Sequence, residues 1–199
     1  MHLKRHAKLF RAACAAAPIG FFLSGQLLPE RLKAATFTYT PTATGGDPWS
    51  TSVNWSAAPP VSAADTTLVF VGDNTTLIPA GQPTATSNDI AGNFLLNRLD
   101  LQGTGPATGA APTISISGNP LEFVANGGSD PVINLNSLDG PVDVVYSTSN
   151  DVVLTNNLTI AGNGDSAFTF SGAIGGPGSI IKTGTGTILL SGANVERRV

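Results

Sequence analysis

Short runs of alternating apolar and polar residues recur along the chain after residue 65. In a strand, successive side chains point to opposite faces, so each run predicts a strand with one buried face. No stretch of about ten residues or more has apolar side chains at helical spacing, so we expect an all-β protein. The predicted strands are Thr66–Val71, Leu99–Leu101, Thr113–Ser117, Leu121–Val124, Val132–Leu135, Val142–Tyr146, Val152–Leu154, Leu158–Ile160, Ala167–Phe170, Ser179–Ile181 and Thr187–Leu190.

The turns between these runs are rich in glycine and asparagine, as in Ser117–Asn119, Ala161–Gly164 and Ser191–Asn194. Between residues 113 and 190 the runs begin roughly every 6 to 12 residues, which suits both a β-sandwich and a parallel β-helix. Repeated corners need residues that tolerate positive φ, and small Ser and Thr side chains at outward positions suit stacked ladders. The turns therefore favour a right-handed parallel β-helix, or β-solenoid, with a β-sandwich as the alternative.

Region 36–65 is different, because it holds Trp49 and Trp55 outside any predicted strand. The first coil of a solenoid exposes its core and an unpaired strand edge unless another segment covers it. We interpret 36–65 as an N-terminal cap region in which the tryptophans belong to the cap or the core. A sugar-binding platform formed by the two rings is the alternative.

The first 35 residues have the pattern of a secretory signal peptide. A basic start, Met1–Arg11, precedes an interrupted apolar stretch, Ala12–Leu28, and a small-residue site at Ala34-Ala35. The apolar stretch is too short and too broken for a membrane-spanning helix. We predict cleavage between Ala35 and Thr36. The alternative is a cytoplasmic protein with a basic amphipathic helix at its start.

Charge and reactive side chains are divided at the same point. After residue 35 the chain has 4 basic and 12 acidic residues, a net charge of −8 that would repel nucleic acid. His2, His6 and Cys14 all lie before the predicted cleavage site. The mature protein would therefore lack triads with His, zinc sites built on Cys or His, and disulfides. We expect no cofactor and assign no catalytic, cofactor-binding or metal-binding residue.

Three aspartates, Asp139, Asp143 and Asp151, form the nearest approach to a catalytic group in the sequence. Stacked acids on one face of a β-helix can act on polysaccharides, often with calcium or a basic residue. Asp139 and Asp151 flank predicted turns, and no matching Lys or Arg accompanies them. A polysaccharide-active enzyme is therefore an alternative to a protein that is not an enzyme.

The segment Gly175–Asn194 resembles the autotransporter-associated β-strand repeat, with units of the kind G-x-G-x-L-x-K-x-G-x-G-x-L-x-L-S-G-x-N. Ile180, Ile188 and Leu190 share one parity and are predicted to fill the coil interior, whereas Lys182 should end a strand with its amine in solvent. The matching positions are Gly176, Gly178, Ile180, Lys182, Gly184, Gly186, Ile188, Leu190, Ser191, Gly192 and Asn194.

This resemblance implies a passenger region, over residues 66–194, of a bacterial autotransporter-like protein that is secreted or displayed at the cell surface or outer membrane. The motif occurs once, so we interpret 195–199 as a truncated tail and the chain as an N-terminal fragment. The expected function is a non-catalytic structural passenger or stalk segment. The alternatives are the polysaccharide enzyme and a carbohydrate-binding or adhesin module. The expected partners are surface glycans or other cell-surface proteins, with membrane contact only through export and no nucleic acid.

Overall fold

The computed structural model describes residues 35–40, 46–72, 83–105, 108 and 112–193. The chain divides into two units, Met1–Arg31 and Leu32–Val199, and every described residue belongs to the second. The predicted signal peptide, apart from Ala35, and the predicted tail 195–199 lie outside the described residues, as does Asn194 of the motif. No helix among the described residues is both long and apolar enough to cross a membrane.

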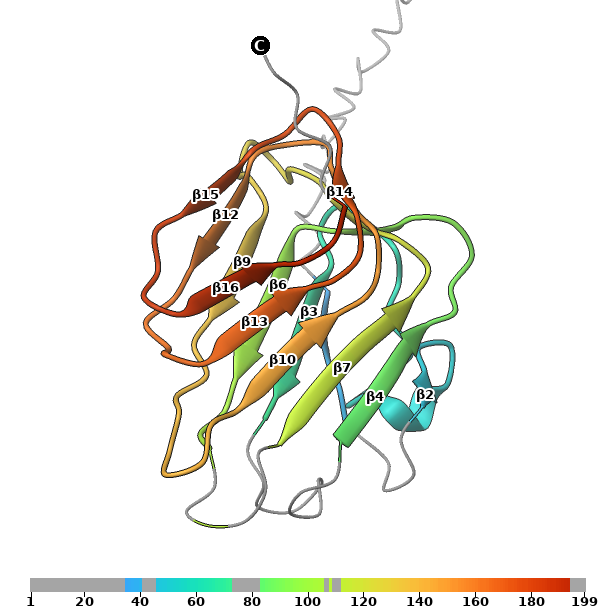
Figure 1. Cartoon of the computed structure of the whole chain (residues 1–199). Helices are drawn as coiled ribbons and strands as arrows, with labels where there is room; N and C mark the ends of the chain where they lie inside the picture. Colours follow the sequence, from blue (N-terminus) through green and yellow to red (C-terminus); the bar gives the residue numbers. More distant parts are fainter. Residues whose placement is uncertain (1–34, 41–45, 73–82, 106–107, 109–111, 194–199) are drawn as a thin grey trace, which may run out of the picture. The chain divides into compact units, whose positions relative to one another are not determined.

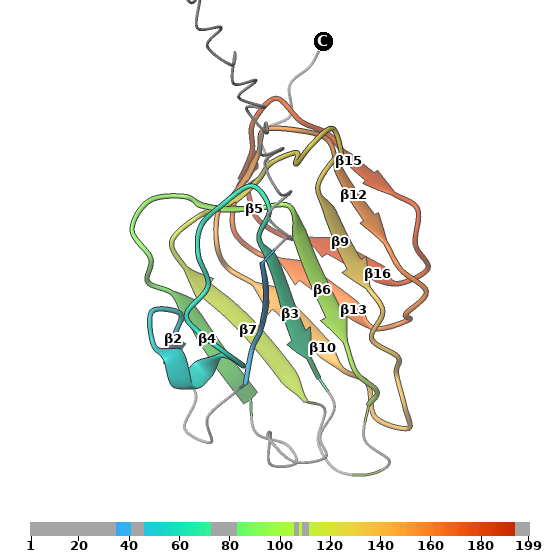
Figure 2. The same ribbon diagram turned by 180° about the vertical axis from the view of Figure 1, so that it is seen from behind.

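The described residues form a parallel β-helix made of three sheets. Figures 1 and 2 show two of them from opposite sides. Sheet I contains β1 (Thr36–Thr38), β3 (Thr67–Val71), β6 (Arg98–Gln102), β9 (Val132–Leu135), β12 (Leu158–Ala161) and β15 (Ile180–Lys182). Sheet II contains β2 (Asp47–Pro48), β4 (Pro83–Asn88), β7 (Thr113–Gly118), β10 (Val145–Thr148), β13 (Ala167–Phe170) and β16 (Thr187–Leu190). Sheet III contains β5 (Phe94–Leu96), β8 (Leu121–Phe123), β11 (Val152–Leu154) and β14 (Ile174–Gly175).

From β4 onward the chain visits sheet II, then sheet III, then sheet I, and returns to sheet II one layer further along. Each strand pairs in parallel with its equivalents in the preceding and following coils, so the expectation of a parallel β-helix is confirmed and the sandwich alternative is wrong. Sandwich sheets pair neighbouring strands in antiparallel fashion, whereas here equivalent strands are separated by a whole coil.

The core is a set of apolar ladders inside the coils. Side chains with the same parity point inward and stack on the equivalent residue of the next coil. Burial of one such large side chain contributes about 1.5–3 kcal/mol. Three of these ladders, one from each sheet, are Phe37, Leu68, Leu99, Ile133 and Ile160 in sheet I; Thr84 (a buried polar residue), Ile114, Tyr146, Phe168 and Ile188 in sheet II; and Phe94, Leu121, Val152 and Ile174 in sheet III.

The outward face of sheet II carries the small hydroxyl side chains that the sequence predicts. Ser147 Oγ donates to Ser115 Oγ at 3.2 Å, across paired positions of β10 and β7. At the ends of these strands, serine hydroxyls also donate to backbone carbonyls of the preceding coil: Ser117 to Thr86, Ser171 to Thr148 and Ser191 to Phe170. These ladders tie each coil to its neighbour outside the core.

Glycine and asparagine stabilise the corners by different means. Among the described residues only glycine has positive φ, for example Gly118 at 100° and Gly162 at 110°. Asparagines act instead through their side-chain amides: Nδ2 of Asn88 and of Asn150 both donate to the carbonyl of Asn119, at 3.0 and 2.7 Å. The expectation of positive φ at the corners therefore holds for glycine. In the coils before and after Gly118, Asn88 and Asn150 stabilise the same corner by side-chain hydrogen bonds instead.

Most of the predicted strands are present with boundaries within two residues, and the largest shift is at β10. The sequence predicts Val142–Tyr146, but the strand is Val145–Thr148. The backbone N–H of Val144 donates to Asp139 Oδ1 at 3.1 Å, so this residue belongs to the corner instead of the sheet ladder. The alternating sequence pattern thus begins in the turn before β10, where the Asp139 side chain accepts the backbone hydrogen bond.

The coils become shorter toward the C-terminal end. Equivalent positions of successive sheet II strands lie closer together in sequence in the last two coils than in the earlier ones, as the series Pro83, Thr113, Val145, Ala167 and Thr187 shows. The connection from sheet I to sheet II accounts for much of this change, because it shortens at every coil. It covers 72–82 after β3, 103–112 after β6, 136–144 after β9, 162–166 after β12 and only 183–186 after β15. The last coils have almost no chain beyond what the strands and corners require.

Candidate functional site

The three aspartates considered as catalytic candidates do not gather into a site. Asp139 Oδ1 accepts hydrogen bonds from the Val144 N–H and, at 2.9 Å, from the Ser166 hydroxyl. Asp151 Oδ1 accepts from the Ala173 N–H at 2.9 Å, and Asp143 is exposed. No group of three or more acidic, His or Cys residues suited to a metal occurs in the part of the chain that the structure describes. Asp139 and Asp151 thus serve as corner acceptors.

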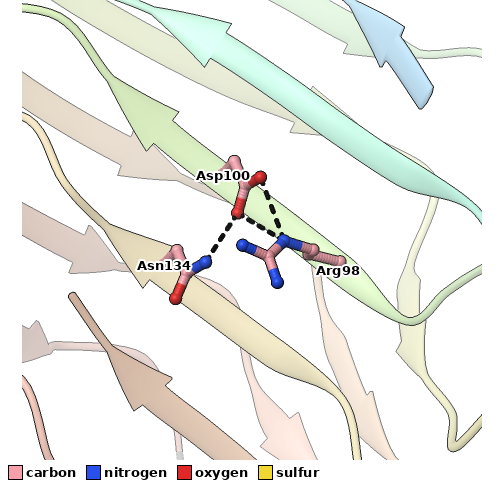
Figure 3. A network of polar contacts seen from close by, with 3 residues as sticks. All are labelled: Arg98, Asp100 and Asn134. Carbon is pink, nitrogen blue, oxygen red and sulfur yellow. Dashed lines mark hydrogen bonds and ion pairs between the residues drawn. The ribbon is translucent and has the colours of Figure 1, made fainter.

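A polar network that sequence reasoning missed lies on the outer face of sheet I (Figure 3). Arg98 Nε donates to both carboxylate oxygens of Asp100 at 2.8 and 3.0 Å, and Asn134 Nδ2 donates to Asp100 Oδ1 at 3.0 Å. Asp100 and Asn134 are paired positions of β6 and β9. The alternation of Arg98, Leu99, Asp100 and Leu101 is the signal that places both charges on one face. Because the carboxylate already accepts three bonds, the network joins strands and presents no free base.

The N-terminal end, by which we mean β1, β2, the 3-10 helix η1 (Ser52–Asn54) and the residues up to Ser56, covers the first coil. The backbone of Tyr39 and Trp55 forms an antiparallel bridge, which places the segment around Trp55 beside β1. Thr40 N–H donates to the Asn54 carbonyl at 2.9 Å, and Ser56 N–H donates to the Thr38 carbonyl at 2.9 Å. Beside β1, the edge of sheet I is therefore paired with the chain itself.

Both tryptophans of this end are in the core. Trp49 is 0% exposed and Trp55 is 4% exposed. The Trp49 ring packs edge-on against Trp55 and Phe94, at centroid distances of 5.6 and 5.0 Å. Its Nε1–H donates to Thr86 Oγ1 at 2.9 Å. Buried rings cannot present a flat face to a sugar, so a carbohydrate platform built on this pair is wrong.

Two carboxylates hold the N-terminal end in place: Asp47 acts within it, and Asp89 joins it to the body. Tyr39 OH donates to Asp47 Oδ2 at 2.7 Å, and burial together with this contact raises the pKa of the Tyr39 hydroxyl far above its ordinary value. The Asp89 carboxylate accepts hydrogen bonds from the Ser50 N–H at 2.8 Å and from the Ser50 hydroxyl. Burial acts to raise the pKa of Asp89, but these bonds outweigh it and hold that pKa below its usual range.

The C-terminal edge, by which we mean β14, β15 and β16, is open in the described residues. These are the last strands of sheets III, I and II. Ile180 and Ile188 pack against the core but are only partly buried, and Leu190 is 41% exposed although its pair Phe170 is buried. Their predicted inward parity is correct, yet the prediction that Leu190 fills the interior is wrong because no described strand lies over it. Lys182 is exposed at the end of β15, as its position predicts.

The glycines of the motif lie where backbones of successive coils come closest. A Cβ on Gly178 would lie 2.1 Å from the Asn156 carbonyl oxygen, and one on Gly192 would lie 1.9 Å from the Gly172 oxygen. Gly176 has φ +109° and similarly faces the Leu154 backbone. Gly175, which is not a matched position, has nothing within 4 Å of its Cβ position. These motif glycines therefore allow a short coil to sit flat on its neighbour.

Exposed apolar side chains and charge are unevenly distributed. Of the large apolar residues that are exposed in the described part of the chain, three belong to the C-terminal edge: Ile181 at 45%, Leu189 at 56% and Leu190 at 41%. Between Ser166 and Ala193 the sequence contains no acid, and its only charged residue is Lys182. Within the described residues the C-terminal edge is thus apolar and acid-free on an otherwise acidic body.

Comparisons of this chain with protein-family models, with curated proteins and with solved structures returned no match.

Proposed function

We propose that this chain is a non-catalytic, exported structural segment of an autotransporter-like passenger, whose role is to form a stiff stack of coils. The observation that carries the proposal is the regular stacking of parallel coils in register, in which the shortest coil contains the repeat-like motif. In such a stack each coil contacts only its neighbours, and stability grows with the number of coils.

The described side chains fit a structural role better than a catalytic one. The candidate acid Asp139 is used by a corner N–H and a serine hydroxyl, and the Asp100 carboxylate is paired with Arg98 and Asn134. Polar groups engaged in this way stabilise a scaffold and leave little capacity for proton transfer. The motif supports the passenger assignment because its glycines occupy backbone contacts between coils.

Export is tested by expressing the full chain in a Gram-negative bacterium and sequencing the N-terminus of the protein recovered outside the cytoplasm. We expect a mature protein that begins at Thr36. Leu23→Arg, which places a charge in the apolar stretch, should block export, while Leu23→Ala at the same position should not. Full-length wild-type protein that stays in the cytoplasm would overturn the exported role.

The absence of catalysis is tested separately with the purified mature chain and a panel of acidic and neutral polysaccharides, with and without calcium. We expect no new reducing ends and no unsaturated products. Turnover that disappears in the Asp139→Asn variant, but persists in Asp130→Asn, would replace the structural proposal with the polysaccharide enzyme.

A further inference from the structure

We propose that Asn126, in the corner between β8 and β9, is a site of non-enzymatic deamidation, in which its side-chain amide becomes a carboxylate. The sequence holds two Asn-Gly pairs, Asn126-Gly127 and Asn163-Gly164. Glycine after asparagine favours this reaction, because it has no side chain to keep its backbone nitrogen away from the amide. The structure makes the two pairs unequal, and this inference does not depend on the proposed function.

The reaction begins when the Gly127 N–H loses its proton to water or hydroxide. The nitrogen then forms a bond to Asn126 Cγ, the bond from Cγ to the side-chain nitrogen breaks, and that nitrogen takes up a proton and leaves as ammonia. Water next opens the resulting succinimide at either carbonyl, which gives aspartate or isoaspartate at this position. The whole sequence consumes one water, releases one ammonia and needs no oxidant or reductant.

Asn126 lies in a tight turn that leaves the reacting atoms accessible. Its backbone N–H donates to the Ser129 carbonyl at 3.0 Å, and the Ser129 N–H donates to the Asn126 carbonyl at 2.9 Å. Between them Gly127 and Gly128 have φ of 56° and 87°, the positive values that a two-residue hairpin loop requires. All four residues are exposed. Within the described residues, neither the Gly127 N–H nor the Asn126 side chain makes a hydrogen bond.

The turn can move without disturbing the stack of coils. Asn126 and Ser129 form an isolated bridge that belongs to none of the three sheets. A Cβ on Gly127 would have no atom within 4 Å, so no other backbone lies against this residue. Asn97 Nδ2 donates to the Ser129 carbonyl at 3.2 Å, but this bond involves neither reacting atom. The Gly127 nitrogen can therefore approach the amide while β8 and β9 keep their pairing.

The second Asn-Gly pair lies in the corner between β12 and β13, where both backbone groups of Gly164 are used. Its N–H donates to the Leu135 carbonyl at 2.9 Å, and its carbonyl accepts from the Thr185 hydroxyl at 2.8 Å. Gly164 is buried, and a Cβ on it would lie 2.3 Å from the Ser137 carbonyl oxygen. A buried and hydrogen-bonded N–H loses its proton only after the corner opens. The neighbouring coils therefore protect Asn163 from the same reaction.

Deamidation at Asn126 changes the surface of the corner and leaves the core intact. It adds one carboxylate close in sequence to Asp130, which is exposed. The isoaspartate product also moves Cβ into the main chain, which alters the spacing of the bridge to Ser129. Neither change reaches the inward residues Phe123 and Ile133, which are buried on either side of the turn. The product is therefore a more acidic chain that keeps its fold.

The test is incubation of the purified mature chain at mildly alkaline pH, followed by chymotryptic peptide mapping with mass spectrometry. Chymotrypsin separates the two pairs, because Leu135 and Tyr146 lie between them. Deamidation at Asn126 should be at least about tenfold faster than at Asn163, since opening the second corner breaks the hydrogen bonds of Gly164.

The chain unfolded in urea is the control, because there the structure no longer distinguishes the two pairs and their rates should converge. Equal rates in the folded protein would overturn the inference. So would a rate ratio that persists unchanged in urea, or an Asn126 amide that survives in the folded protein while the unfolded chain reacts.

Two glycine variants of the same turn identify the attacking nitrogen. Gly127→Ala places a methyl group beside that nitrogen and should slow deamidation at Asn126 by at least about tenfold, because the reacting atoms approach less closely. Gly128→Ala is the matched control, since Gly128 also has positive φ and nothing within 4 Å of its Cβ position. It should change the rate far less. Circular dichroism checks that both variants keep the fold, and equal slowing in both would contradict the role of the Gly127 nitrogen.

Discussion

The two ends of this β-helix differ in how the outermost coil is covered. At the N-terminal end, an antiparallel segment and two fully packed tryptophans cover the first coil. At the C-terminal edge, the coil is regular, its glycines fit closely on the coil beneath, and its outer apolar side chains are exposed. One end is irregular in sequence and closed, whereas the other carries the repeat-like motif and is open in the described residues.

The difference shows that a repeat and a cap impose different demands on sequence. Each strand of a repeating coil must match the layer below, so its pattern is visible as alternation and as glycine at fixed positions. A cap must end the pattern, so it uses large side chains and local hydrogen bonds that follow no period. A molecule closed at one end can extend in only one direction.

The largest effect is expected from shortening a buried side chain in the closed end. Trp49→Ala removes a ring that is fully buried and in edge contact with Trp55 and Phe94. We expect a loss of about 3–5 kcal/mol in the free energy of unfolding, measured by urea denaturation followed by circular dichroism.

The matched truncation at the open end is Leu190→Ala. Because this side chain is 41% exposed, the loss should stay below about 1 kcal/mol. Equal losses for the two variants would contradict the contrast between a packed cap and an uncovered edge.

An intermediate effect is expected from two adjacent glycines of the last coil, Gly175 at the end of β14 and Gly176 directly after it. Gly176→Ala forces a side chain into φ +109° and within 2.5 Å of the Leu154 oxygen, and should destabilise the fold by about 1–3 kcal/mol. Gly175→Ala meets no atom within 4 Å and should be neutral or slightly stabilising. Thermal unfolding of the two variants checks this pair, and a larger loss at Gly175 would show that close packing is not what selects the motif glycines.

The smallest effect is a dependence of the closed end on pH. The folded pKa of Asp89 is lowered, so its bonds to Ser50 add stability above the unfolded carboxyl pKa of about 3.9, and that stability is lost as the pH falls through the folded value. Ser50→Ala should therefore have a lower free energy of unfolding than the wild type at neutral pH, and this difference should disappear in acid. At the open end, the Ser191 hydroxyl donates to the Phe170 carbonyl, which does not titrate. The difference in the free energy of unfolding between the wild type and Ser191→Ala should therefore not vary with pH. Urea denaturation at several pH values checks both.

Sequence reasoning found most strands of the regular part of the fold and missed β1, β2, β4, β5 and β14. The run from Thr113 to Leu190 alternates clearly because its inward positions are apolar. Strand β4 escaped notice because its buried inward residues are Thr84 and Thr86, whose hydroxyls make them look like loop residues. Thr86 is tolerated in the core because its hydroxyl accepts from Trp49 and donates to the Asp47 carbonyl.

The open edge could not be predicted from the sequence for a different reason. Parity correctly assigns Ile188 and Leu190 to the inward face, but parity does not state whether another layer lies above. The roles of Asp139 and Asp151 were equally out of reach. The alternating pattern places them beside turns but does not reveal which backbone N–H groups donate hydrogen bonds to their carboxylates. Burial and hydrogen bonding depend on the neighbouring coil, which is distant in sequence.

The shortening connection between sheets I and II bears on how this scaffold could diversify. The strands fix the register, whereas this one corner covers 72–82 in an early coil and only 183–186 in the last without disturbing the pairing on either side. A series of connections of independent length is thus anchored along one edge of the stack. Such a row could accept grafted epitopes or natural length variation, one coil at a time, while the ladders beneath keep their alignment.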